Sequence, residues 1–221
     1  MLIAGLDDAG RGAVIGPLVI GGVLTDENGV RELQRLGVKD SKKLNPKRRR
    51  VLYEKVREVA LKCHVIIISP SEVDYAVSRK VETKGLNRLE GLTMARMINY
   101  LRPEVAYIDA SDVSIERFKR YILEGLTREV DLIIEHKADS KYPIVSAASI
   151  VAKVTRDQQI ESIKRKYGDF GSGYMSDPRT VRFLRELISR EKRCPKFVRA
   201  SWKPVKKLIE KTKSIRIDSF R

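Results

Sequence analysis

The sequence predicts an α/β fold, in which a mixed β-sheet is flanked by helices and followed by a small C-terminal helical region. Two apolar segments near the start of the chain have strand composition and are joined by a glycine-rich turn. Further strand-like segments then alternate with segments of helical periodicity. The chain ends in basic amphipathic helices. We therefore expect a main domain over residues 1–178 and a basic helical region and tail over residues 179–221.

The individual elements follow from local patterns. The expected strands are rich in β-branched and other apolar residues, and they cover Met1–Leu6, Ala13–Leu24, Cys63–Ile68, Val105–Ile108 and Val130–Glu135. The helices show apolar residues at helical spacing and cover 45–61, Leu86–Leu101, Phe118–Leu126, Pro143–Tyr167, Arg179–Arg190 and Lys203–Lys213. Asn45 and Pro46 form a typical helix start, whereas Pro103 and Gly168 follow helix ends. The small residues 146–149 predict close packing of the long helix.

The charge of the chain indicates a polyanionic partner. The 221 residues include 45 Lys and Arg against 29 Asp and Glu, which gives a net charge of +16. Residues 181–221 hold 14 of these basic residues and only 4 acidic ones. A solubilising basic tail is one explanation. A surface that follows the phosphates of a nucleic acid beside an acidic centre explains the pattern better.

Other features bear on the cellular compartment. Cys63 and Cys194 are too few for a disulfide framework, so we expect unpaired thiols in a reducing compartment. The first apolar segment is too short and lacks the basic start of a signal peptide, and no segment approaches the length of a membrane span. We expect a cytoplasmic protein with no membrane association.

Carboxylates stand at the ends of three predicted elements. Asp7 and Asp8 end the first strand, Asp109 ends a later strand, and Asp139 precedes the proline-started helix. Taken singly, these residues could start turns or cap a helix. Together they predict a site of hard oxygen ligands for Mg²⁺ or Mn²⁺, which supports phosphodiester hydrolysis.

Two glycine-containing segments accompany the carboxylates. Glycines in Gly10-Arg11-Gly12 let backbone N–H groups approach a phosphate, and the arginine adds a charged donor, although a plain hairpin turn explains the segment equally well. Tyr174, in a loop rich in glycine and serine, suits stacking on a sugar or base, or it is a half-buried loop residue. We expect structural roles for His64 and His136.

These segments resemble type 2 ribonuclease H in its archaeal form, and the match runs in order over nearly the whole chain. The motifs that carry the resemblance are Gly5-Leu6-Asp7-Asp8-Ala9-Gly10-Arg11-Gly12, Val38-Lys39-Asp40-Ser41-Lys42-Lys43-Leu44, His136-Lys137-Ala138-Asp139, Ser146-Ala147-Ala148-Ser149 and Gly168-Asp169-Phe170-Gly171-Ser172-Gly173-Tyr174. The resemblance implies a ribonuclease H-like catalytic domain. It also implies cutting of RNA in RNA/DNA hybrids and 5′ of single ribonucleotides in duplex DNA, leaving 3′-hydroxyl and 5′-phosphate ends.

The resemblance also assigns expected roles to residues. It implies that the metal-binding carboxylates are Asp7, Asp8, Asp109 and Asp139. It implies that Gly10, Arg11 and Gly12 contact the 2′-hydroxyl and adjacent phosphates, with Tyr174 at the ribose. It further implies backbone contacts for Lys42 and Asn87.

The chain departs from the family pattern at Asp8, where the family has Glu. The missing methylene withdraws the carboxylate, which predicts lower activity or an altered metal preference. Adjacent strand residues also point to opposite faces, so Asp7 and Asp8 share a metal only if the strand twists or bulges.

Three further expectations concern partners and alternatives. Ile217-Asp218-Ser219-Phe220 resembles the second half of a sliding-clamp-binding peptide, or it is a frayed helix end. We expect a monomer. The alternative functions are a catalytically inert nucleic-acid-binding module and a sugar or acetate kinase-like phosphotransferase; the latter lacks a second glycine-rich phosphate segment after Asp109.

Overall fold

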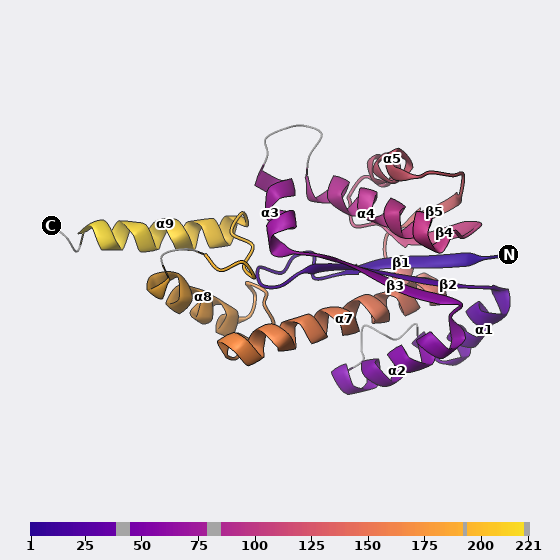
Figure 1. The fold of residues 1–221 in the computed structure, drawn as a ribbon, viewed down its shortest axis with the longest axis horizontal. Coiled ribbons are helices and arrows are strands. Elements are labelled where there is room, and N and C mark those ends of the chain that lie inside the picture. Colours follow the sequence, from indigo (N-terminus) through magenta and orange to yellow (C-terminus); the bar gives the residue numbers. More distant parts are fainter. Residues whose placement is uncertain (39–44, 79–84, 192–193, 219–221) are drawn as a thin grey trace.

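A five-stranded sheet lies between two layers of helices (Figure 1). The computed structural model describes residues 1–38, 45–78, 85–191 and 194–218, with side chains up to residue 211. The strands are β1 (Ile3–Ala9), β2 (Leu18–Thr25), β3 (Lys62–Ile68), β4 (Val105–Asp109) and β5 (Asp131–Glu135), in the order β3-β2-β1-β4-β5. The pairs β1–β2 and β2–β3 are antiparallel, whereas β1–β4 and β4–β5 are parallel. The predicted mixed sheet is confirmed.

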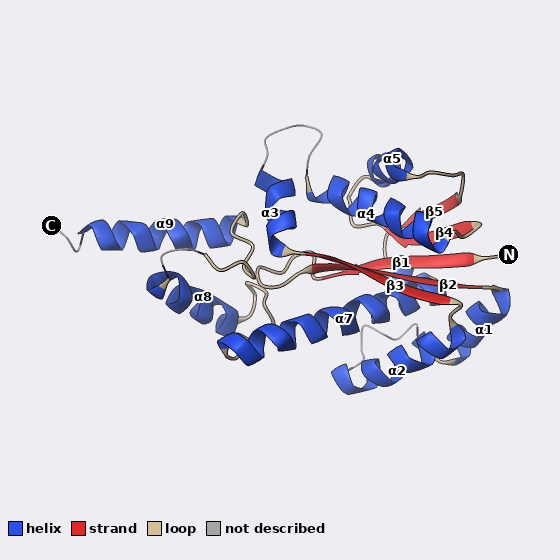
Figure 2. Ribbon diagram, viewed as in Figure 1, coloured by secondary structure: helices blue, strands red, loops and turns tan. Residues whose placement is uncertain are grey.

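The helices surround this sheet, as Figure 2 shows. They are α1 (Glu27–Arg35), α2 (Pro46–Val59), α3 (Pro70–Ser78), α4 (Leu86–Leu101), α5 (Ile115–Gly125), α6 (Ala138–Lys141), α7 (Pro143–Tyr167), α8 (Pro178–Arg190) and α9 (Lys203–Asp218). Helices α3, α4 and α5 share one apolar core with the sheet, and α1, α2 and α7 share another on the opposite face. Helices α8 and α9 extend the molecule along its longest axis (Figure 1).

Several predicted boundaries were wrong. Strand β1 continues to Ala9, past the predicted end at Leu6, so Asp7 and Asp8 lie within the strand. Strand β2 begins at Leu18, and residues 10–17 form a loop instead of the start of a strand. Helix α5 begins three residues before Phe118, because the Ser114 hydroxyl accepts a hydrogen bond from the Arg117 amide at 3.3 Å.

Helices α1, α3 and α6 were not predicted. Helix α1 is mostly polar and buries only Leu33, although Asp26 caps it by accepting from the Gly29 amide at 2.8 Å. In α3 the apolar residues Val73, Tyr75 and Val77 alternate as they would in a strand. Helix α6 has four residues, too few to show periodicity.

Helix α7 packs directly on the sheet, as its small residues predicted. Residues 146–149 are fully buried. A Cβ on Gly5 of β1 would lie 2.2 Å from the Ile144 carbonyl oxygen, and one on Gly21 of β2 would lie 2.5 Å from that of Ala148. The two glycines therefore allow the helix backbone to approach β1 and β2 closely.

A third apolar core joins the C-terminal helices to the loop between β1 and β2. Val14 and Ile15 of this loop pack with Leu184 of α8, with Val205 of α9 and with Val198 before α9. Ile15 and Val198 also pair as an isolated antiparallel bridge. The C-terminal helices thus contact the loop that follows β1. Among the described residues, no helix is both long enough and apolar enough to cross a membrane.

Candidate active site

Three carboxylates converge at the carboxyl ends of the parallel strands. Asp7 in β1, Asp109 at the end of β4 and Asp139 in α6 each offer an oxygen within 4.8 Å of the others. Asp7 and Asp139 are 6% and 3% exposed, and Asp109 is partly buried. Such a compact set of hard oxygen donors fits Mg²⁺ or Mn²⁺.

A sharp turn after β5 brings Asp139 back to the sheet. Lys137 has a φ of +57°, in the left-handed region that L-residues rarely adopt. The next residue, Ala138, donates its amide hydrogen to Asp109 Oδ1 at 3.2 Å. The Ser146 hydroxyl donates to the carbonyl oxygen of Asp139, which fixes α6 against the start of α7. The turn therefore holds two of the three carboxylates in relation to each other.

The electrostatics of the group favour a bound cation. Burial raises the pKa of Asp7 well above its usual value, and the negative charges of Asp8 and Asp109 raise it further. A hydrogen bond with Ser149 and the charge of Lys153 act in the opposite direction. Because a divalent cation would offset both the burial and the mutual repulsion, these residues suit a metal ion.

Asp8 is not a member of this group of three. The β1–β2 pairing runs without a bulge from Ile3 opposite Thr25 to Ala9 opposite Val19, so Asp7 and Asp8 project from opposite faces. Burial, followed by the charge of Glu90, raises the pKa of Asp8 to about 7, and the charge of Asp109 contributes as well. The predicted four-carboxylate set therefore appears as a group of three with Asp8 beside it.

Glu90 is a buried acidic residue that the sequence analysis missed. It is fully buried on α4, and its Oε2 accepts from Arg11 Nε at 3.0 Å and from the Ser111 hydroxyl at 3.1 Å. Burial raises the pKa of Glu90, and Arg11 lowers it. Glu90 lies on the apolar face of α4, one helix turn before Met94, and this position in the sequence pattern could have indicated that Glu90 is buried.

The Gly10-Arg11-Gly12 segment lies next to the carboxylates and is held by α4. Arg11 Nη2 donates to Asn87 Oδ1 at 2.5 Å, so Asn87 contacts the segment directly. Gly10 has a φ of +86°, and a Cβ there would lie 2.4 Å from Arg156 Nε. Only glycine fits this position.

Tyr174 faces the same segment from a hydrogen-bonded loop. A Cβ on Gly12 would lie 3.9 Å from Tyr174 Cε1. The Arg156 guanidinium carbon lies 4.9 Å from the centre of the Tyr174 ring. Since Arg156 also packs against Gly10, it contacts both parts of the site.

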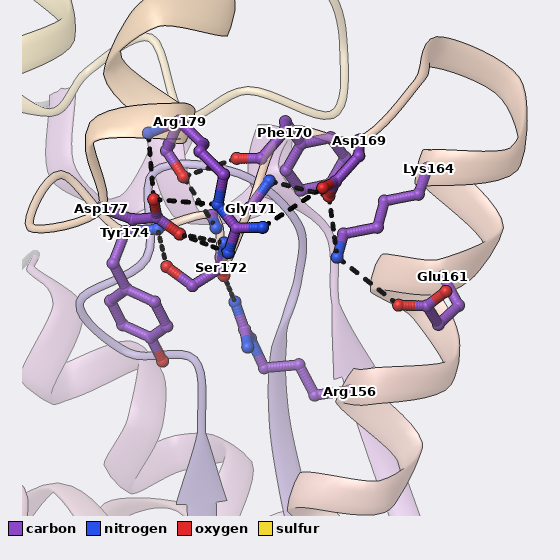
Figure 3. Close-up of polar contacts among 12 residues, drawn as sticks. Arg156, Glu161, Lys164, Asp169, Phe170, Gly171, Ser172, Tyr174, Asp177 and Arg179 are labelled. Carbon is purple, nitrogen blue, oxygen red and sulfur yellow. Dashed lines mark hydrogen bonds and ion pairs between the residues drawn. The ribbon is translucent and has the colours of Figure 1, made fainter.

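Figure 3 shows the bonds that order this loop. Asp177 accepts from the Ser172 amide at 2.8 Å and from the Arg179 amide at 2.9 Å, and these bonds hold its pKa at about 2. Asp169 forms ion pairs with Lys164 at 3.1 Å and Arg179 at 3.3 Å. The loop rich in glycine and serine that the sequence predicts is thus closed by its own side chains.

The remaining predicted residues lie outside the carboxylate group or outside the described residues. Lys42 falls in the segment 39–44, and Ser219 and Phe220 fall after residue 218, so the structure does not describe them. His64 stacks on Tyr100, and His136 Nδ1 lies 3.3 Å from the Ala110 carbonyl oxygen. Cys63 and Cys194 are free thiols, as predicted.

The parallel strands β1, β4 and β5 beside an antiparallel pair, with carboxylates at their carboxyl ends, have the arrangement of the ribonuclease H-like class of proteins. The family model of ribonuclease HII matches residues 4–205, and the chain belongs to this family. Ribonuclease HII from Pyrococcus abyssi is 47% identical over the whole chain and 97% of the relative. Membership makes the protein a ribonuclease H, and it supports endonuclease activity on RNA/DNA hybrids.

Solved structures agree with this assignment. The crystal structure of ribonuclease H2 from Pyrococcus horikoshii has 45% identity and a TM-score of 0.87, and the match covers 96% of this chain and 99% of that one. The ribonuclease HII of a PCNA:RNase HII complex from Archaeoglobus fulgidus has 45% identity and a TM-score of 0.82, covering 92% and 96%.

Proposed function

We propose that this ribonuclease H cuts duplex DNA 5′ of single embedded ribonucleotides as well as the RNA strand of hybrids, in a metal-dependent hydrolysis that leaves 3′-hydroxyl and 5′-phosphate ends. The observation that carries the proposal is the convergence of Asp7, Asp109 and Asp139 beside the Gly10–Gly12 segment and Tyr174. The arrangement puts a candidate metal site and a candidate ribose-reading site on one edge of the sheet.

Asp7, Asp109 and Asp139 would hold the metal, with Asp8 as a further carboxylate nearby. Mg²⁺ or Mn²⁺ bound there would activate a water and stabilise the oxygen that leaves the phosphodiester. Ser149 and Lys153 hold Asp7 from the α7 side, where Lys153 Nζ donates to the Ser149 hydroxyl at 2.7 Å. The protein thus orients the carboxylates before the substrate arrives.

The residues beside the carboxylates would bind the substrate. Gly10, Arg11 and Gly12 would contact the 2′-hydroxyl and the adjacent phosphates, and Glu90 and Asn87 support this role because they hold Arg11. Tyr174 would pack on the ribose, and a 2′-hydroxyl distinguishes RNA from DNA. Lys42 and Asn87 would contact the nucleic-acid backbone.

The direct test is cleavage of an end-labelled duplex with one ribonucleotide in Mg²⁺, in Mn²⁺ and in EDTA, with an RNA/DNA hybrid and an all-DNA duplex in parallel. We expect one metal-dependent cut 5′ of the ribonucleotide, a cut hybrid and an intact all-DNA duplex. Binding without cleavage in either metal would contradict the proposal and favour the inert module, which the family assignment does not support.

The same assay measures the effect of Asp8. The Asp8→Glu variant extends the carboxylate by about one C–C bond, about 1.5 Å, toward the length typical of the family. We expect about tenfold faster cleavage in Mg²⁺, because the longer side chain reaches closer to the other carboxylates. An Asp8→Glu variant that cuts more slowly than the wild-type protein would show that the site is adapted to aspartate.

We further propose that Ile217–Phe220 binds a sliding clamp. Helix α9 extends away from the sheet toward the C-terminus (Figure 1), and the Archaeoglobus fulgidus relative was solved in complex with PCNA. Calorimetry with a peptide of residues 211–221 tests this proposal, with an Ile217→Ala and Phe220→Ala peptide as the control. Absence of binding by the natural peptide would contradict the proposal that this segment binds a sliding clamp. We also propose that the protein is a cytoplasmic monomer. Light scattering of the purified protein tests the oligomeric state, because it measures the molecular mass.

A further inference from the structure

Arg199 is the largest side chain that the structure buries completely, and it lies beneath the loop that follows β1. Its Nη2 donates to the Gly10 carbonyl oxygen at 2.7 Å, its Nη1 to that of Arg11 at 2.8 Å and its Nε to that of Gly16 at 3.2 Å. One guanidinium therefore bonds both ends of the 10–16 loop. The donors of arginine are spread over a rigid planar fork and reach three separate carbonyls at once, whereas a lysine ammonium offers its three donors from a single nitrogen.

Burial of Arg199 also places a positive charge in the interior of the protein, away from water. Among the described residues it forms no ion pair, and burial followed by the charge of Arg156 lowers its pKa to about 10. It therefore stays charged at neutral pH, balanced by the carbonyl oxygens and by the Trp202 ring, whose centre lies 5.2 Å away. A buried charge is expensive, so an apolar residue would serve packing alone better.

The segment that carries Arg199 is fixed from two sides. The Arg199 amide donates to the Val14 carbonyl oxygen at 2.9 Å. Asp74 of α3 accepts from the amides of Ala200 at 2.8 Å and Ser201 at 3.0 Å, and from the Ser201 hydroxyl. The backbone next to Arg199 is thus anchored to α3, a helix outside the loop that the guanidinium supports.

We infer that Arg199 is a positioning residue, which sets the Gly10–Gly12 backbone in the geometry that reads a ribonucleotide. The inference rests on the proposed function, because it assigns the loop to substrate. The carbonyl oxygen of Arg11 accepts a hydrogen bond from Arg199, and the Arg11 side chain donates one to Glu90. Both the backbone and the side chain of Arg11 are therefore fixed. A segment fixed in this way presents its N–H groups to the ribose and phosphate without rearrangement.

The test compares full-length Arg199→Lys and Arg199→Gln with Arg35→Gln, a matched change at an exposed arginine of α1. Arg199→Lys keeps the charge and loses the three-carbonyl geometry. The assays are kcat and KM on the single-ribonucleotide duplex, thermal melting, and hydrogen exchange at the Ala13 amide, which donates to the Gly10 carbonyl oxygen at 3.2 Å. The exchange measurement needs no activity.

We expect Arg199→Lys to lower kcat by about 10²-fold, the effect of a displacement of about 1 Å in a site, with KM changed by less than about threefold. Exchange at Ala13 should become at least about tenfold faster while amides of β1 keep their protection, and Arg35→Gln should match the wild type. Unchanged kcat and exchange in both Arg199 variants would overturn the inference, and so would a loss of kcat explained by melting below the assay temperature. A wild-type protein that does not cut the duplex would reject the proposed function. The positioning role of Arg199 is then judged by hydrogen exchange alone, and exchange at Ala13 that is the same in the Arg199 variants and the wild type would reject it.

Discussion

At the scale of residues, Asp7 and Asp8 differ because the strand that carries them is regular. Asp7 faces Ser149 on α7 and joins the carboxylate group, whereas Asp8 lies on the face where the charges of Glu90 and Arg11 act on it. A glutamate at position 8 would have the extra reach to approach the group from that face. The alternation of side chains along a strand explains why neighbouring residues have different environments.

The raised pKa of Asp8 predicts how the stability of the metal-free protein depends on pH. The carboxyl ionises near pH 4 in the unfolded chain and near pH 7 in the folded protein. Between these values the folded state binds more protons, so stability falls as pH rises. Asp8→Asn should therefore melt at a higher temperature than the wild type at pH 7.5 in EDTA, with little difference at pH 4.

Thermal melting at several pH values checks this prediction. Asp131→Asn, a change at an exposed carboxylate at the start of β5, serves as the control and should follow the wild-type profile. Wild-type and Asp8→Asn curves that run parallel from pH 4 to pH 7.5 would show that Asp8 titrates normally in the folded protein.

The sequence indicated the acidic and glycine residues of the candidate site, whose roles stay a prediction, but not the buried groups that hold them. Asp109 could be identified from the sequence because it follows an apolar strand. Gly10 could be identified because it lies in the turn between two predicted strands. Glu90 and Arg199 are charged residues buried by contacts with residues far away in the chain. Local patterns describe only the neighbours in sequence. The periodicity of α4 could indicate that Glu90 is buried, but it could not indicate that Arg11 is its partner, and a lone arginine in a loop is assigned to the surface.

At the scale of elements, the packing of α7 against β1 and β2 sets the distance between Ser149 and Asp7. The approach depends on glycines in the two strands, because a Cβ on Gly5 would meet backbone atoms of Ile144 and Val145. Backbone atoms cannot rotate away as the end of a side chain can. Helix α7 would have to move as a unit, and Ser149 would move with it.

Gly5→Ala should therefore destabilise the protein and slow cleavage. Overpacking of this kind costs about 3 kcal/mol, or a fall of about 10 °C in Tm for a chain of this size. Thermal melting and single-turnover cleavage below Tm measure the two effects. Gly85→Ala is the control, since a Cβ there meets nothing within 4 Å. A Gly5→Ala protein with wild-type Tm would mean that α7 lies farther from the sheet.

The elements that the sequence analysis predicted correctly are those with strong periodicity or composition. Helix α7 has the predicted bounds, and β3 and β4 differ from prediction by one residue. Helix α3 was missed because its buried residues are set by contact with α4 and the sheet, and its own pattern alternates like a strand. Tertiary packing overrode the local pattern there.

At the scale of the whole molecule, a strongly basic chain carries an acidic site at one edge of its sheet. The exposed residues Lys203, Lys206 and Lys207 lie on α9, which follows the Arg199 segment. Exposed basic residues of this kind would bind the phosphates of a duplex outside the acidic site. The charge pattern was visible in the sequence, whereas the buried contact between Arg199 and the first loop was not.

Replacing Lys203, Lys206 and Lys207 with Gln should weaken binding to every duplex by a similar factor. Each lost phosphate contact reduces the slope of log Kd against log salt by about 0.9, so three contacts reduce it by about 3. Fluorescence anisotropy at several salt concentrations measures the slope. The control with the same net charge changes Arg35, Arg120 and Arg128 to Gln. Equal slopes for the two triple variants would show that binding senses only net charge.

The most direct test of the account replaces Asp109 with Asn and follows single-ribonucleotide cleavage in Mg²⁺ together with the rise in Tm that Mg²⁺ produces. We predict cleavage slower by at least about 10²-fold, because even indirect partners of metal ligands contribute 10- to 100-fold, and loss of most of the Mg²⁺-dependent rise in Tm. The control variant Asp131→Asn should keep the wild-type cleavage rate and the full Mg²⁺-dependent rise in Tm. An Asp109→Asn protein that cuts at the wild-type rate and is still stabilised by Mg²⁺ would contradict the assignment of the three carboxylates.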